Sequence, residues 1–100
     1  MLGTIEYLDI MNQTQQTKIN IVTTGSGVQS SAAPENGIYI IWWDVPCLLK
    51  INSTVGDTVT ADTGLEMTSA GFLPFIVNKN MFITAKATVS SGTVRWMRVG

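Results

Sequence analysis

Short apolar segments alternate with turn-forming residues along most of the chain, a pattern typical of β-strands. Alternation with a period of two places apolar side chains on one face of a strand, and short continuous apolar runs are typical of strands buried on both faces. The pattern predicts strands over residues 18–24, 37–44, 47–52, 57–61, 72–77, 81–89 and 93–100. No segment has convincing helical spacing, so we predict an all-β fold, a small antiparallel β-sandwich or barrel of about six to eight strands.

The connections between these segments carry the usual signals of loops and turns. Residues 25–37 and 61–71 are rich in Gly, Ser and other small residues, so we expect loops there. Pro46 ends the strand before it because it has no N–H for a ladder hydrogen bond, and Pro74 indicates an edge strand or a bulge. A turn at residues 90–92 predicts that the last two strands form a hairpin.

The strand over residues 37–44, with the sequence GIYIIWWD, breaks the alternation because it is apolar on both faces. In a regular strand, adjacent side chains point to opposite faces, so the two neighbouring tryptophans must diverge. We expect one set of side chains in the core and the other against a partner or the N-terminal segment. The two sets are Tyr39, Ile41 and Trp43 on one face, and Ile40 and Trp42 on the other.

Residues 1–17 do not share the strand pattern. An incipient helical stripe at Ile5 and Leu8 is interrupted by neighbouring apolar residues, and a polar stretch follows it. We interpret this segment as an extended N-terminal arm or lead-in that could cross onto a neighbouring subunit, with a frayed terminus as the alternative. Residues 18–100 then form a single β-sandwich domain.

The composition is poor in charge for a soluble domain and favours a subunit of an assembly. Charged residues make up 13% of the chain, about half the usual share, and hydrophobic residues make up 45%. The six Lys and Arg residues are scattered, which argues against a nucleic-acid partner. No apolar run approaches the ~20 residues of a transmembrane helix, so we expect no membrane partner. Glu6 and Asp9 interrupt the N-terminal apolar residues, so we expect no signal peptide and synthesis in a host cytoplasm.

The sequence offers little catalytic chemistry. It contains no histidine, which removes Ser-His and Cys-His nucleophile pairs and most zinc sites. Its only cysteine, Cys47, stands at the head of an apolar strand, and we interpret it as a buried structural thiol. Asp57, Asp62 and Glu66 remain candidates for a carboxylate pair or a calcium site, but their spacing matches no calcium loop. We therefore expect no enzymatic activity, no metal and no cofactor.

Aromatic and branched residues are in surplus, and they are the main functional signal. A strand in a two-layer sandwich gives one face to the core, so a second apolar face needs another cover. Aromatic side chains are enriched at protein interfaces, which predicts an interface with further subunits. Two alternatives stay open: a glycan-binding platform of exposed Trp and Tyr rings, and a monomer that covers both faces itself. The predicted interface residues are Tyr39, Ile41, Trp42, Trp43, Phe72, Phe75 and Trp96.

The C-terminal half contains an ordered set of short patterns. In chain order these are Ala70-Gly71, Phe75, the alternating Ile83, Ala85 and Ala87, and Ser91-Gly92-Thr93-Val94. Over residues 47–100, this arrangement resembles small virion proteins of tailed bacteriophages. The resemblance implies a β-sandwich that acts as a head decoration or cement protein on the capsid surface, where it bridges capsomers of the major capsid protein. It also implies a homo-oligomer, with a trimer favoured, and no catalytic residues; a tail or neck subunit, or a glycan-binding fibre or tail adaptor, is the alternative.

Overall fold

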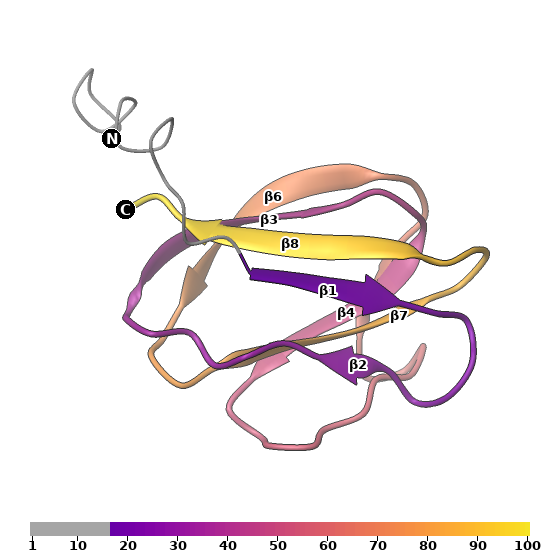
Figure 1. Cartoon of the computed structure of the whole chain (residues 1–100), viewed down its shortest axis with the longest axis horizontal. Coiled ribbons are helices and arrows are strands. Elements are labelled where there is room, and N and C mark those ends of the chain that lie inside the picture. The colour runs from indigo at the N-terminus through magenta and orange to yellow at the C-terminus, as the bar shows by residue number, and fades with distance from the viewer. Residues whose placement is uncertain (1–16) are drawn as a thin grey trace.

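The fold of residues 17–100, the part of the chain that the computed structural model describes, is built from β-strands and the loops between them (Figure 1). Branched and aromatic residues, whose side chains favour extended backbone, dominate the longer strands. The strands are β1 (Thr17–Ile21), β2 (Val28–Gln29), β3 (Gly37–Trp43), β4 (Cys47–Asn52), β5 (Leu65–Met67), β6 (Gly71–Val77), β7 (Phe82–Ala87) and β8 (Gly92–Arg98). The prediction of an all-β fold is confirmed.

The strands form two four-stranded antiparallel sheets that pack face to face as a β-sandwich. Sheet A has the order β1-β8-β3-β6, and sheet B has the order β2-β7-β4-β5. In Figure 1, sheet A forms the upper layer and sheet B the lower one. β1 and β6 are therefore the edges of sheet A, and β3 and β8 are its centre.

The core lies between the sheets and combines large side chains from one layer with small ones from the other. Sheet A contributes the rings of Tyr39, Trp43 and Trp96, which are all at most 5% exposed. Sheet B contributes Ala85 and Ala87, whose small side chains leave room for these rings. The centroids of the Tyr39 and Trp96 rings lie 5.2 Å apart. The other members of the core are Ile21, Ala33, Ile41, Cys47, Leu49, Val77, Ile83 and Val94.

The two neighbouring tryptophans of β3 point to opposite faces, as the pattern predicts. Trp43 lies in the core with Tyr39 and Ile41, whereas Ile40 and Trp42 are half-buried on the outer side of sheet A. The division of this strand into two sets is therefore confirmed, and the structure identifies which set belongs to the core.

The prediction of a C-terminal hairpin is wrong, because β7 and β8 lie in different sheets. β7 pairs with β2 and β4, while β8 pairs with β1 and β3. The Ala87 N–H donates to the Val22 carbonyl oxygen (3.1 Å), and the Thr88 N–H donates to the Pro46 carbonyl oxygen (3.1 Å). The Ala87 bond ties the end of β7 to the residue that follows β1 of sheet A, whereas the Thr88 bond extends the pairing of β7 with β4 by one residue. The turn at residues 90–92 therefore carries the chain from one sheet to the other.

Residues 57–61 form a loop, which contradicts the strand predicted there. The Asp57 carboxylate accepts a hydrogen bond from the Asn52 side chain and forms an ion pair with Lys50. Local side-chain bonds of this kind compete with ladder formation. Val59, whose alternation suggested the strand, is instead buried by the loop.

Two short strands lie in segments that we predicted as loops. β2 pairs with β7, and β5 pairs with β4, at the two edges of sheet B. They contain two and three residues, which is too short for a period of two to show in the sequence. Pairing with longer neighbours, rather than local propensity, forms these strands.

The predicted N-terminal arm, residues 1–17, lies almost wholly outside the described residues. Thr17 belongs to β1, so the sandwich begins one residue earlier than predicted. The arm over residues 1–16 stays a prediction.

Candidate interaction surface

The side of sheet A that points away from the core presents apolar side chains on three adjacent strands. Because the period of a strand is two, the residues between the core-facing ones point outward. The strand register aligns these residues in rows that cross the sheet from β8 through β3 to β6. We call this surface the outer face of sheet A. The first row crosses from β1 to β6 and contains Lys18, Arg95, Trp42 and Phe72. The second crosses from β8 to β6 and contains Met97, Ile40 and Pro74. The third joins Ile38 of β3 to Ile76 of β6.

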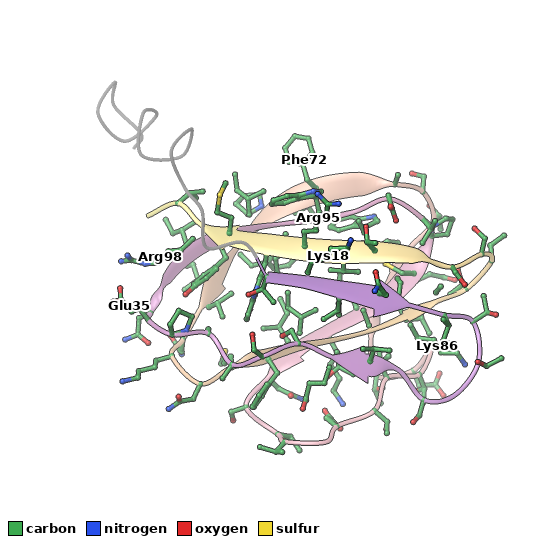
Figure 2. The ribbon with its side chains drawn as sticks, in the orientation of Figure 1. Lys18, Glu35, Phe72, Lys86, Arg95 and Arg98 are labelled. Carbon is green, nitrogen blue, oxygen red and sulfur yellow. The ribbon has the colours of Figure 1, made fainter. Side chains whose placement is uncertain are left out.

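Exposure increases across this face toward the β6 edge. Ile40, Trp42 and Met97, at its centre, are half-buried, whereas Phe72 and Ile76 are 68% and 84% exposed. Figure 2 shows Phe72 pointing away from the ribbon at this edge. A contiguous group of large exposed apolar side chains marks an interaction site on a soluble protein.

The edge itself favours recognition by side chains over strand addition. β6 pairs with β3 alone and holds Pro74 in its middle, and proline has no N–H to donate to a further strand. The Leu73 side chain points toward the inner side of sheet A but is still 47% exposed, because β6 is an edge strand. A partner that meets β6 therefore contacts apolar side chains on both of its faces.

Sheet B differs from sheet A because a loop of the chain, residues 53–63, covers part of its outer side. The Gln29 side chain donates to the Thr54 carbonyl oxygen (2.8 Å) and accepts from the Gly56 N–H (2.9 Å). Thr84, which points outward from β7, is fully buried and accepts a hydrogen bond from Gln29 (3.2 Å). On the outer side of sheet A, by contrast, Ile38, Phe72 and Ile76 are exposed.

An ion pair fastens this loop to sheet B. The Lys50 Nζ lies 2.8 Å from the Asp57 carboxylate and donates to the Thr58 carbonyl oxygen (3.3 Å). Hydrogen bonds from Lys50 and Asn52 lower the pKa of Asp57 to about 2. The folded state therefore favours the ionised carboxylate.

We expect this contact to be lost in acid. A lowered folded-state pKa stabilises the fold above the unfolded value of about 4, and the contribution disappears as the pH falls through about 2. Urea unfolding at about pH 5 and about pH 2.5 measures the loss, which Asp57→Asn should reduce. Asp62→Asn, at an exposed position in the same loop, is the matched control. An unchanged pH difference in Asp57→Asn would contradict the expectation.

Four of the residues predicted to form an interface lie in the core. Tyr39, Ile41, Trp43 and Trp96 are at most 5% exposed. The prediction is wrong for these four, because their side chains offer no surface to a partner in this fold. The aromatic surplus that suggested an interface is absorbed by the small side chains on the facing side of sheet B.

Of the other three predicted residues, two lie on the outer face of sheet A and one points inward. Trp42 and Phe72 belong to it and are partners in the strand register. Phe75 points inward from β6 and packs partly against the core. The structure thus brings two of the predicted residues together on one open surface.

The predicted interface residues left out several members of this surface, namely Ile38, Pro74, Ile76 and Met97. Ile40 was placed with Trp42 on the second face of its strand but was not named as an interface residue. The sequence does contain a signal for this surface. Every second residue is apolar through residues 38–42 and again through residues 72–76, on the face opposite to the core. Two such segments in neighbouring strands form an apolar stripe across a sheet. The predicted interface residues were chosen mainly because they are aromatic, and not by the face of the strand to which they point.

The carboxylates singled out in the sequence do not gather into a metal-binding cluster among the described residues. Within residues 17–100, no three His, Cys, Asp or Glu side chains lie close enough to hold a metal ion, so Asp57, Asp62 and Glu66 form no such group. Cys47 is fully buried, and burial raises the pKa of its thiol to about 11. It packs in the core as the structural thiol that we predicted.

Comparisons with known proteins give no match: no protein-family model, curated protein or solved structure matches the chain. Residues 17–100 contain no helix with the length and hydropathy needed to span a bilayer.

Proposed function

We propose that this protein is a structural subunit of a bacteriophage virion, a capsid decoration or cement protein that stabilises the head by bridging capsomers. The observation that carries the proposal is the outer face of sheet A, an apolar surface that the described residues leave open. The resemblance of residues 47–100 to small phage virion proteins supports a virion as the assembly to which this subunit belongs. The subunit would act on the capsid surface as a homo-oligomer, a trimer in the favoured case, with the major capsid protein as its partner.

Association would be driven by the removal of apolar side chains from water. Buried apolar surface contributes ~25 cal/mol per Å² before the costs of ordering are subtracted. Phe72, Leu73 and Ile76 at the β6 edge are well exposed and have apolar area to bury. Many copies around a shell would multiply such weak contacts through avidity.

A glycan-binding role has less support from the geometry. A stacking platform needs exposed rings, and Tyr39, Trp43 and Trp96 are buried in the core. Trp42 borders solvent, but its neighbours on the face are aliphatic or basic apart from Phe72. The surface therefore resembles a protein interface more closely than a sugar platform.

The double variant Phe72→Asp, Ile76→Asp tests this proposal. We expect it to fold, because both side chains are mostly exposed, and to bind capsids at least about tenfold more weakly, a change of roughly 1.4 kcal/mol. Val89→Asp, at another exposed apolar residue in the loop between β7 and β8, is the matched control. Co-sedimentation with capsids of the phage that carries the gene measures binding, and light scattering measures the oligomeric state.

Wild-type protein that stays monomeric and sediments with no part of the virion would overturn the proposal. Sedimentation with tails alone would reject the decoration role in favour of a tail or neck subunit. Equal binding by the double variant and by Val89→Asp would show that a different surface binds the capsid.

A further inference from the structure

The segment that precedes β1 combines apolar and acidic residues with a polar linker. Sixteen residues precede Thr17, and seven of residues 1–11 are apolar or aromatic. Glu6 and Asp9 are the only charged side chains in residues 1–16. Residues 12–16 are all Asn, Gln or Thr. An apolar, negatively charged segment is thus attached by a short polar tether to the edge of sheet A.

The outer face of sheet A is complementary to this segment. Lys18 and Arg95 are partners in the register of β1 and β8, and Arg95 is in turn the partner of Trp42 on β3. In Figure 2, Arg95 and Phe72 lie at the same margin of the sandwich. Asp44, the acid that follows β3, accepts two hydrogen bonds from Thr93, and the charge of Arg95 also helps to lower the pKa of this carboxyl. Two cations therefore border an apolar surface, and complementary charges fix the register of a contact of this kind.

The linker is long enough to bring the segment over the centre of this face. Adjacent strands lie ~4.8 Å apart, so β3 is about 10 Å from β1 across β8. Five extended residues span about 17 Å. The register of β1 begins at Thr17 opposite Trp96, one residue short of Met97, so the chain enters sheet A beside the row of Met97 and Ile40.

We propose that residues 1–11 pack on the outer face of sheet A of the same chain, over Ile40, Trp42 and Met97, with Glu6 and Asp9 beside Lys18 and Arg95. A segment on a short tether has an effective concentration in the millimolar range, so it occupies the face ahead of a second copy in dilute solution. Phe72 and Ile76 remain available to a partner at the β6 edge, where exposure is greatest. The inference does not depend on the proposed function.

A spin label on the full-length chain tests this contact. Gly3→Cys places a thiol in the segment, and the fully buried Cys47 does not compete for the label. We expect loss of the NMR signals of the Trp42 indole N–H and the Met97 amide. The amides of Leu48 and Lys86, whose side chains point to the outer side of sheet B, should keep their signals. A mixed sample tests whether the contact lies within one chain. It combines isotope-labelled chains that lack the spin label with spin-labelled chains that lack isotopes, and the Trp42 signal should not decrease in it.

Charge reversal tests the pairing that the inference names. Glu6→Lys with Asp9→Lys should restore most of the Trp42 indole signal, and adding Lys18→Glu with Arg95→Glu should remove it again. Asp62→Lys, a reversal of an exposed acid in a loop of the other layer, is the matched control and should leave the loss intact.

Survival of the Trp42 signal in the spin-labelled wild-type chain would overturn the inference. Equal loss in the mixed sample would also overturn it, because a second copy would then supply the segment. Both measurements use the isolated protein, so their failure is distinct from a failure to bind capsids.

Discussion

Trp43→Ala is expected to destabilise the folded chain by about 3–5 kcal/mol, the usual cost of removing a buried tryptophan. The Trp43 ring is 5% exposed, and its Nε1 donates to the Ser69 carbonyl oxygen at 2.8 Å. The ring also lies over Gly71, where an added Cβ would be 3.4 Å from it. Deletion therefore leaves a cavity and removes a bond that ties the β5–β6 connection to the core. Trp42→Ala, one residue earlier on the outer face, removes a half-buried ring and is expected to cost clearly less.

Urea unfolding followed by far-UV circular dichroism measures both variants without relying on tryptophan fluorescence. A domain of this size has only ~5–15 kcal/mol of stability, so Trp43→Ala should remove a large share of it and lower the urea midpoint in proportion. Trp43→Phe keeps an aromatic ring in the core and should lose much less stability than Trp43→Ala. An equal or larger loss for Trp42→Ala would contradict the assignment of the two faces of β3.

Gly92→Val is the second substitution with a large expected effect. Gly92 opens β8, and a Cβ added there would overlap the Asp44 carboxylate and the Val45 side chain. That carboxylate accepts hydrogen bonds from the Thr93 N–H (2.7 Å) and hydroxyl (2.9 Å). The Thr93 backbone bond is the main cause of a lowered pKa at Asp44. Overpacking costs roughly 1–3 kcal/mol. The hydrogen bonds lost from Asp44 add less than they would in the core, because this carboxylate is exposed and water can replace Thr93.

The same urea experiment measures Gly92→Val, with Ser91→Val as the control at the exposed neighbouring position. We expect the control to differ little from the wild-type chain. Asp44→Asn should reproduce part of the loss, because the amide keeps the shape but not the charge. If the urea midpoints of Gly92→Val and Ser91→Val were equal, the prediction would be wrong, because the β3–β4 connection would then move aside at little cost.

The longer strands could be predicted because their side chains alternate or are continuously apolar, as in β3, β4 and β7. The short strands β2 and β5 could not, since their pairing depends on neighbours that lie far away in the sequence. The predicted hairpin failed for the same reason. β8 pairs with β1 and β3, which lie far away in the sequence, and not with β7 beside it.

The candidate surface was predictable only in part. The alternation in β3 divided Tyr39, Ile41 and Trp43 from Ile40 and Trp42, but both sets are apolar, so hydropathy did not distinguish core from surface. The choice depends on what faces the strand across the sandwich. Ala85 and Ala87 on β7 leave space there for large rings, and no local pattern in the sequence of β3 contains that information.

Cys47 would give this protein the same covalent state inside and outside a cell. The thiolate is the form that oxidises and exchanges disulfides. With its pKa raised to about 11, only about one thiol in ten thousand is ionised at neutral pH, and the side chain is fully buried. In the role proposed above, a subunit released from a reducing cytoplasm into oxidising surroundings would thus keep its free thiol. Neighbouring copies would stay unlinked by disulfides, and the durability of the assembly would rest on non-covalent contacts alone.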